Sequence, residues 1–158
     1  MPRGGGVGIG TGREDHPPCK RPESVLVVVH TRGGEVLMLR RTAPAGFWQS
    51  VTGSLRRGES PRHAAERELF EETGLRAGGR LVDCRRRVRF PIVRAWRSRY
   101  APGVRFNLEH QFRLELPRRR LIRLNPDEHR EYRWLPRQRA ARLASSWTNR
   151  EAIQRLPL

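Results

Sequence analysis

Short runs of apolar residues in the first third of the chain favour strands. Residues 24–31, SVLVVVHT, form a nearly continuous apolar run rich in branched side chains, which is typical of a buried strand. Residues 32–34, RGG, supply a turn, and residues 35–41, EVLMLRR, continue the pattern, so the two runs predict a hairpin. Residues 47–53, FWQSVTG, predict a further short strand.

One helix is predicted after these strands, over residues 61–73. Ser60 is a good N-cap, and Pro61 in the first turn lacks only an N–H that the helix would leave unpaired. Gly74 follows the last turn, where a glycine cap is expected. The apolar contacts of this helix would come from Ala64, Ala65, Leu69 and Phe70.

The second half of the chain predicts three more strands and two more helices. The strands are expected over residues 80–92, 105–117 and 131–136. Helical patterns in residues 136–146 and 148–156 close the chain. Strands around one central helix, with helices at the end, indicate an α/β protein whose mixed sheet carries helices on its faces.

The length of 158 residues fits one domain with its own core. We expect that domain to span residues 20–158, because residues 1–19 are rich in glycine and proline and are expected to form a disordered tail. No apolar run approaches the roughly 20 residues that span a bilayer, and the N-terminus lacks the apolar segment of a signal peptide. Cys19 and Cys84 lie far apart, which favours a reduced, cytoplasmic protein.

The chain carries a large positive charge, because 33 lysines and arginines stand against 16 acidic residues. A formal net charge of +17 favours contact with polyanions, namely nucleic acid, an anionic membrane or a phosphorylated small molecule. A coding preference for arginine explains the charge equally well, since Lys20 is the only lysine. Charge alone therefore does not choose between these classes.

Glutamates gather on the predicted helix in spite of this basic background. Glu68, Glu71 and Glu72 share one face, because residues three and four apart are neighbours on a helix. They repel one another, and the last two lie near the helix C-terminus, where negative charge is disfavoured. A solvated acidic face paired with arginines such as Arg67 or Arg76 is one explanation. A divalent cation is the other, since Mg²⁺ takes carboxylate oxygens together with water and substrate phosphates.

The spacing of the glutamates favours the metal. From Gly53 the sequence reads glycine, five residues, Glu59, seven residues, Arg67-Glu68-Leu69, one residue, Glu71-Glu72, one residue, Gly74-Leu75. This pattern resembles the signature of the Nudix hydrolases at every defined position. The resemblance implies an α/β fold of the Nudix type, an α/β/α sandwich with a mixed β-sheet. It also implies a hydrolase that depends on Mg²⁺, for which Mn²⁺ can substitute.

The same resemblance assigns roles to the glutamates. Glu68, Glu71 and Glu72 would hold the metal with assistance from Glu59, and Arg67 would orient one of the glutamates. Glu71 and Glu72 are also expected to be catalytic. The metal would neutralise diphosphate oxygens and lower the pKa of a bound water that attacks phosphorus.

Stretches outside this pattern narrow the substrate. Residues 20–29, 36–41, 47–54, 99–104 and 145–154 together resemble the bacterial dihydroneopterin triphosphate pyrophosphatases. The resemblance implies hydrolysis of dihydroneopterin triphosphate to the monophosphate and pyrophosphate, a step in folate biosynthesis. It places substrate contacts at Lys20, Arg41, Thr52, Phe90 and Ser146. Ordinary roles on a strand surface or at a helix cap stay open for these residues.

A further carboxylate is expected outside the helix. The resemblance makes Glu128 a catalytic residue and a metal ligand, with Asp127 beside it as the alternative. His129 is a weaker candidate for a base, and we expect it to be a loop residue. Trp48 and Trp96 are expected to pack in the core, the commoner role for a tryptophan in a strand.

Two other functions stay open. The first is a Nudix hydrolase with broad activity on nucleoside and deoxynucleoside triphosphates. The second is a nucleic-acid-binding protein that uses its arginines, which the complete set of glutamates and the lack of a known RNA- or DNA-binding signature disfavour. We therefore expect a small-molecule triphosphate as the partner, and neither nucleic acid nor a membrane.

Overall fold

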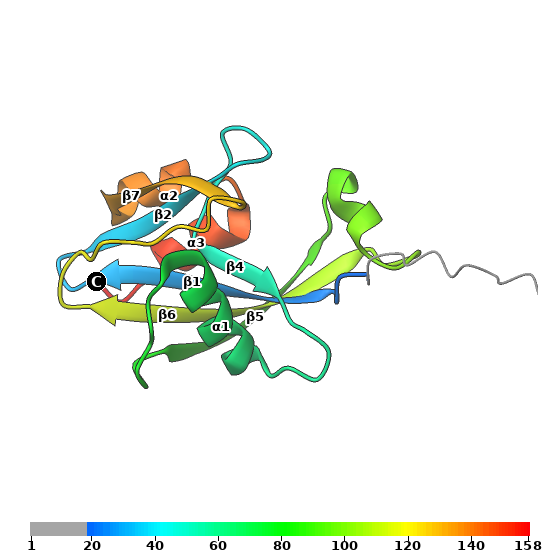
Figure 1. Cartoon of the computed structure of the whole chain (residues 1–158), viewed down its shortest axis with the longest axis horizontal. Helices are drawn as coiled ribbons and strands as arrows, with labels where there is room; N and C mark the ends of the chain where they lie inside the picture. The colour runs from blue at the N-terminus through cyan, green and yellow to red at the C-terminus, as the bar shows by residue number, and fades with distance from the viewer. Residues whose placement is uncertain (1–18) are drawn as a thin grey trace, which may run out of the picture.

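One mixed sheet runs through the middle of the computed structural model, which describes residues 19–158 (Figure 1). The expected tail, apart from Cys19, lies outside the described residues. In chain order the elements are β1 (Glu23–Thr31), β2 (Glu35–Arg41), β3 (Trp48–Gln49), β4 (Val51–Ser54), α1 (Pro61–Thr73), β5 (Val82–Pro91), the 3-10 helix η1 (Arg94–Arg99), β6 (Phe106–Leu116), β7 (His129–Pro136), α2 (Arg137–Leu143) and α3 (Trp147–Gln154).

The expected elements are confirmed with two differences. The segment predicted as one strand after the hairpin is divided at Ser50 into β3 and β4, which pair with different strands. The helix η1 was not predicted, because its sequence has no helical spacing of apolar residues. Pro91 ends β5 and still lies opposite Phe106 in the register.

Strand β1 organises the sheet. One edge of β1 pairs in parallel with β6 along its whole length, from Glu23 opposite Leu108 to Thr31 opposite Leu116. The other edge is shared, because β4 pairs with residues Ser24 to Val27 and β2 pairs at His30. Strands β2 and β4 therefore diverge from one edge, and β3 and β7 extend the β2 side. This divergence positions the residues of the candidate site.

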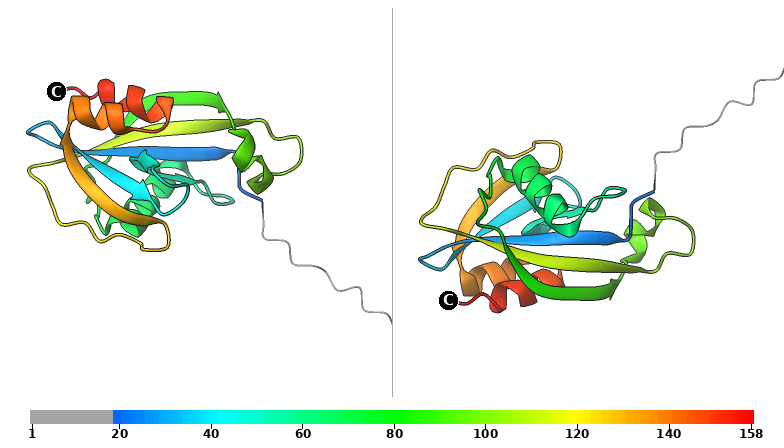
Figure 2. Two further views of the ribbon diagram at one scale, coloured as in Figure 1. Left: turned by 90° about the horizontal axis from the view of Figure 1, so that it is seen from above. Right: turned by 90° about the horizontal axis from the view of Figure 1, so that it is seen from below.

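Helices cover both faces of the sheet, with α1 on one face and α2 and α3 on the other (Figure 2). The period of two along β1 explains this, because Val25, Val27 and Val29 pack under α1, while Leu26 and Val28 pack under α2 and α3. The expected α/β/α sandwich is therefore confirmed. Among residues 19–158, no helix is long and apolar enough to cross a membrane.

Helix α1 begins and ends where the sequence predicts. The Ser60 side chain accepts a hydrogen bond from the backbone N–H of His63 at 3.2 Å. Gly74 has φ 75°, the left-handed conformation that glycine adopts without strain, and its N–H donates to the carbonyl of Phe70 at 2.8 Å. These caps fix the helix so that its last turns face β4.

Candidate metal and substrate site

Helix α1 turns Glu68 and Glu72 inward against β4. Glu72 is only 2% exposed, and its Oε2 accepts a hydrogen bond from the backbone N–H of Thr52 at 3.3 Å. A Cβ on Gly53 would overlap the carboxyl group of Glu68, so this helix residue approaches the strand as closely as only glycine allows. The glycine and the glutamate of the sequence pattern are therefore in direct contact.

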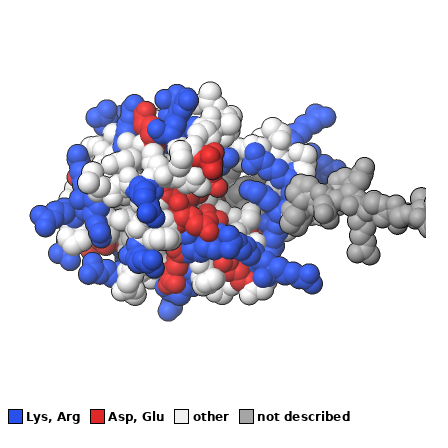
Figure 3. Space-filling view, viewed as in Figure 1, with Lys and Arg blue, Asp and Glu red and all other residues white. Residues whose placement is uncertain are grey.

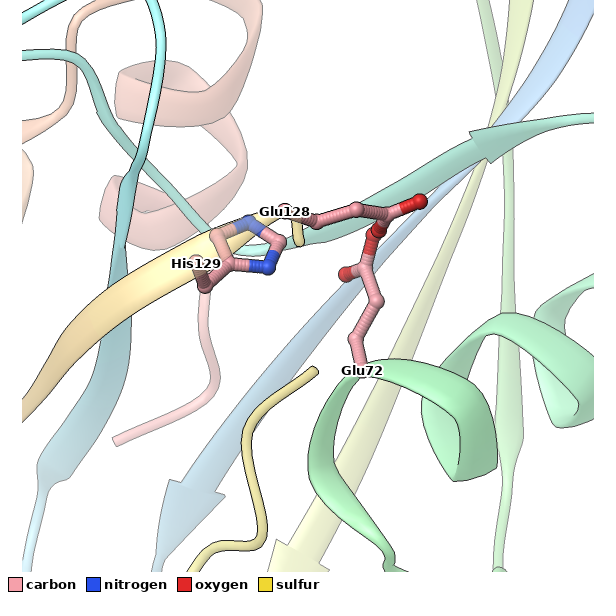
Figure 4. Close-up of side chains that lie close together, drawn as sticks. All are labelled: Glu72, Glu128 and His129. Atoms are coloured by element: carbon pink, nitrogen blue, oxygen red, sulfur yellow. The ribbon is translucent and has the colours of Figure 1, made fainter. Parts of the chain in front are cut away.

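The turn that precedes β7 brings a third carboxylate, that of Glu128, to the same place. Ligand atoms of Glu72, Glu128 and His129 all lie within 4.8 Å of one another. Figure 4 shows the carboxyl groups of Glu128 and Glu72 pointing toward each other, Glu128 from just before β7 and Glu72 from α1. Between the two neighbouring acids of the loop, Glu128 and not Asp127 belongs to this cluster among the described residues.

The carboxylates of Glu72 and Glu128 have no salt-bridge partner among residues 19–158. Burial raises the pKa of Glu72 well above its usual range, and repulsion by Glu68 and Glu128 adds to the rise. Burial also raises the pKa of Glu68 to about 6, although Arg67 opposes it. Glu72 and Glu128 thus offer oxygen ligands without a salt-bridged partner, which fits a hard divalent cation that these two residues and Glu68 would hold.

Arg67 holds two of the glutamates in position. Its guanidinium group donates to both carboxylate oxygens of Glu59, at 2.7 and 2.8 Å, and to Oε1 of Glu68 at 2.8 Å. Hydrogen bonds from Arg67 are the main reason that the pKa of Glu59 falls to about 2. Glu59 is thus fully engaged by Arg67 and the backbone, whereas Glu68 keeps an oxygen for another partner. The expected orienting role of Arg67 agrees with these contacts.

Glu71 is placed differently from the other two helix glutamates. Its side chain is 44% exposed and pairs with Arg56 and with Arg67, each at 3.3 Å. The structure therefore brings Glu72 and Glu128 together, places Glu68 near enough for its charge to raise the pKa of Glu72, and leaves Glu71 on the rim. A metal or catalytic role for Glu71 stays a prediction. To bind a metal, the Glu71 carboxylate would have to give up its ion pairs with Arg56 and Arg67.

His129 is not the loop residue that the sequence suggested. It is the first residue of β7 and only 1% exposed, and its Nε2 lies 3.1 Å from Nε2 of Gln49. The other ring nitrogen, Nδ1, is buried without a hydrogen-bond partner among residues 19–158. Burial and the charge of Arg41 lower the pKa of His129 to about 4, so the ring is neutral near pH 7.

A group of cations faces the acidic cluster. The Lys20 N–H donates to the carbonyl of Arg99 at 2.8 Å, which ties the start of the domain to the end of η1. Desolvation lowers the pKa of Lys20 and of Arg41, and each is further lowered by Arg99. Figure 3 shows acidic side chains gathered in the middle of this face with basic ones around them. A polyphosphate would bind the cationic group directly and the carboxylates through the divalent cation that they would hold.

Arg99 and Trp96 are site residues that sequence reasoning missed. The indole of Trp96 has the guanidinium groups of Arg41 and Arg99 at 5.7 and 5.8 Å from its ring centroid. It also lies 5.5 Å from the ring of Phe47. The expected core role of Trp96 is wrong, since it is half-buried beside these cations, whereas Trp48 is 7% exposed and packs in the core as expected. Trp96 and Arg99 reach the candidate site because η1 folds toward it, and the sequence of η1 has no helical spacing of apolar residues that would have predicted this.

The other predicted substrate residues come from β4, β5 and the start of α3. The Thr52 hydroxyl donates to the carbonyl of Val25 at 2.9 Å, and Phe90 is half-buried on β5. Ser146 is the N-cap of α3, and its Oγ accepts from the N–H of Asn149 at 3.1 Å. Ser146 is therefore a helix cap, the ordinary role that stayed open for it. Contacts of Ser146, Thr52 and Phe90 with substrate remain predictions.

Known proteins resemble this chain over almost all of its described length. A family model described as the NUDIX domain matches residues 20–156. The dihydroneopterin triphosphate diphosphatase of Escherichia coli (strain K12) is 46% identical over 139 residues, covering 85% of this chain and 91% of that protein. The Haemophilus influenzae protein of the same name is 36% identical over 140 residues, with coverage of 86% and 87%.

A solved structure extends the similarity to three dimensions. The E. coli dihydroneopterin triphosphate pyrophosphohydrolase superposes with a TM-score of 0.82 at 45% identity, covering 87% of this chain and 96% of that chain. The residues that match the NUDIX family model, 20–156, include every element from β1 to α3. The candidate site therefore lies in a fold and in a sequence context that both point to one family.

Proposed function

This chain belongs to the Nudix hydrolases, and from that premise we propose that it hydrolyses dihydroneopterin triphosphate to dihydroneopterin monophosphate and pyrophosphate with Mg²⁺. Relatives that bear the diphosphatase name match it at 46% and 36% identity over most of both chains. In this proposal the reaction is a step of folate biosynthesis, takes place in the cytoplasm and acts on a small-molecule triphosphate.

One observation carries the proposal: the carboxylates of Glu68, Glu72 and Glu128 converge without a salt bridge on Glu72 or Glu128, opposite a group of cations. Burial and mutual repulsion make this cluster costly when it is empty. A bound Mg²⁺ would supply charge neutralisation and activation of a water for attack on phosphorus. A bound divalent cation would relieve this repulsion while the carboxylates stay ionised.

The chain's own residues divide the remaining work. Arg67 holds Glu68 in one orientation, and the Thr52 N–H holds Glu72. Lys20 and Arg41, joined by Arg99, would bind the phosphate oxygens, with the guanidinium groups able to bind in a bidentate manner. Glu128 and Glu71 are the residues we propose for orienting the attacking water.

A panel of triphosphates tests the proposal. Purified protein with Mg²⁺ is given dihydroneopterin triphosphate, GTP, ATP and CTP in turn, and pyrophosphate release is measured. We expect dihydroneopterin triphosphate to have the highest kcat/KM by a wide margin. Similar values on all four substrates would instead support the broad nucleoside triphosphate hydrolase.

A further inference from the structure

A buried polar cluster lies on the face of the sheet that α3 covers, next to the candidate site. On this face β6 presents Asn107, Glu109 and Gln111, which are between 3% and 5% exposed. The opposite face of the same strand presents Phe112 and Leu114, which pack under α1. A strand with apolar residues on one buried face and amide and carboxyl groups on the other is unusual, because buried polar groups cost free energy unless they are paired.

Glu109 is the centre of this cluster and lacks a cationic partner among residues 19–158. Its Oε1 accepts from Gln111 at 3.1 Å, and its Oε2 has only a long contact of 3.4 Å with the Thr148 hydroxyl. Burial raises its pKa to about 6. The carboxylate therefore retains unused capacity to accept hydrogen bonds, which a ligand with N–H donors would fill.

Asn107 provides an independent indication of a ligand. Its Nδ2 donates to the Ser24 hydroxyl at 2.8 Å, but its Oδ1 is buried and has no hydrogen-bond partner within the part of the chain that the structure describes. A buried acceptor without a partner is unfavourable, because it loses its hydrogen bonds to water and gains none in return. One residue separates Asn107 from Glu109 along β6, so both side chains point to the same face and leave their free acceptors close together.

The strand register connects this cluster with the predicted substrate residues. Asn107 lies opposite Phe90 on β5, and paired residues project from the same face. A hydrogen-bonded chain leads from the Ser146 hydroxyl to Thr148 at 3.1 Å and from there to Glu109. Two of the predicted substrate contacts therefore border the cluster.

The distance from the metal cluster is suitable for one substrate. Thr52, whose N–H binds Glu72, pairs with Leu26 of β1, and Ser24 of β1 pairs with Glu109. Thr52 and Glu109 are thus two strands and two residues apart, a separation of about 12 Å. This separation is comparable with the span from the amino edge of a pterin, across two fused rings and a three-carbon chain, to the first phosphates.

We propose that Glu109 and Asn107 bind the amino edge of a pterin ring and so determine the specificity of the site. The 2-amino group and the neighbouring N3–H are adjacent donors, which the two oxygens of the Glu109 carboxylate would accept. The second hydrogen of the amino group would reach Oδ1 of Asn107. Phe90 would supply an aromatic contact to the ring. This assignment rests on the proposed function. It concerns the pterin ring, which the phosphate-binding residues would not contact.

Glu109→Gln tests the assignment, with Glu115→Gln as its control. Glutamine keeps the shape but replaces one acceptor by a donor, which opposes the amino edge. Glu115 is exposed on the same strand and lies in a weak pair with Arg32 at 3.6 Å. Binding of neopterin, which has the ring without phosphates, and binding of pyrophosphate are measured by calorimetry for each variant.

We expect Glu109→Gln to weaken neopterin binding at least about tenfold and to leave pyrophosphate binding unchanged. In turnover, kcat/KM should fall for dihydroneopterin triphosphate and for GTP, which has the same pair of donors, but not for ATP. Neopterin binding equal to that of the wild type, or an equal loss of neopterin and pyrophosphate binding, would overturn the assignment. If Glu109→Gln does not fold, Asn107→Ala takes its place with the same criteria.

The assignment and the proposed function can fail separately. Wild-type protein that does not turn over dihydroneopterin triphosphate would refute the proposed function, while the neopterin measurement would still decide the role of Glu109. Rapid turnover that Glu109→Gln leaves intact would refute the role of Glu109 alone.

Discussion

Gly53→Ala should disturb the metal cluster through a single methyl group. The φ angle of Gly53 is one that alanine adopts without strain, so the effect is purely steric. The added Cβ would overlap the Cγ, the Cδ and an oxygen of Glu68, which is held from the other side by Arg67. Glu68 must therefore move, and its charge-assisted hydrogen bond with Arg67 must lengthen or break.

The expected size of the effect follows from this overlap. Overpacking costs about 1–3 kcal/mol of unfolding free energy, and displacement of a metal-orienting contact lowers metal affinity or activity about 10–100-fold. The Mg²⁺ concentration for half-maximal pyrophosphate release and urea unfolding would be measured together. Gly33→Ala is the matched control, because Gly33 also lacks a left-handed φ and its added Cβ would make only an ordinary contact with Thr31. A Gly53→Ala variant with the Mg²⁺ dependence of the wild type would refute this arrangement of Glu68.

Three further predictions follow from the charges of the site. Glu72→Gln should abolish most turnover. In a melting experiment it should raise the thermal midpoint of the metal-free protein, because it removes a buried carboxyl group whose pKa is raised by burial. A lower midpoint would contradict this. The Glu59–Arg67 pair lowers the pKa of Glu59 from 4.5 to about 2, so its stabilisation, on the order of 2–3 kcal/mol, is present above pH 4.5 and lost as the pH falls toward 2. Urea unfolding of Glu59→Gln should accordingly lack this acid-induced loss, and an unchanged pH dependence would argue against it. Arg99→Ala should raise KM for the triphosphate more than it lowers kcat, whereas Arg94→Ala, an exposed change on the same helix, should alter neither in steady-state kinetics; equal effects of the two would remove Arg99 from the site.

The sequence predicts the local part of the site well. Gly53, Glu59, Arg67 and Glu68 lie within sixteen positions of one another, and helix geometry and capping fix their mutual placement. The sandwich follows equally from the alternation along β1 and the caps of α1. These features depend on periods of two and 3.6 residues, which are visible in a single sequence.

The residues that reach the site through contacts between distant parts of the chain could not be predicted from sequence periodicity. Arg99 and Trp96 reach the site because η1 folds back toward Lys20, and no periodic pattern encodes that path. His129 is buried only because β7 pairs with β2, a contact between residues far apart in the chain. The outward position of Glu71 depends on Arg56, which a helical wheel does not include.

Sequence alone also leaves the buried face of β6 ambiguous. Asn107, Glu109 and Gln111 alternate with Leu108 and His110, so the pattern resembles a strand with one solvated face. The structure covers that face with α3 and thereby turns ordinary surface residues into buried acceptors. The covering helix, and not the strand's own sequence, creates this cluster.

Steady-state pyrophosphate release from dihydroneopterin triphosphate, with Mg²⁺ and with excess chelator, tests the central claim most directly. The carboxylate cluster and the facing cations predict rapid release that depends on Mg²⁺ and greatly exceeds the rates with GTP, ATP and CTP. Release that persists after chelation, or equal rates on all of these triphosphates, would contradict the account.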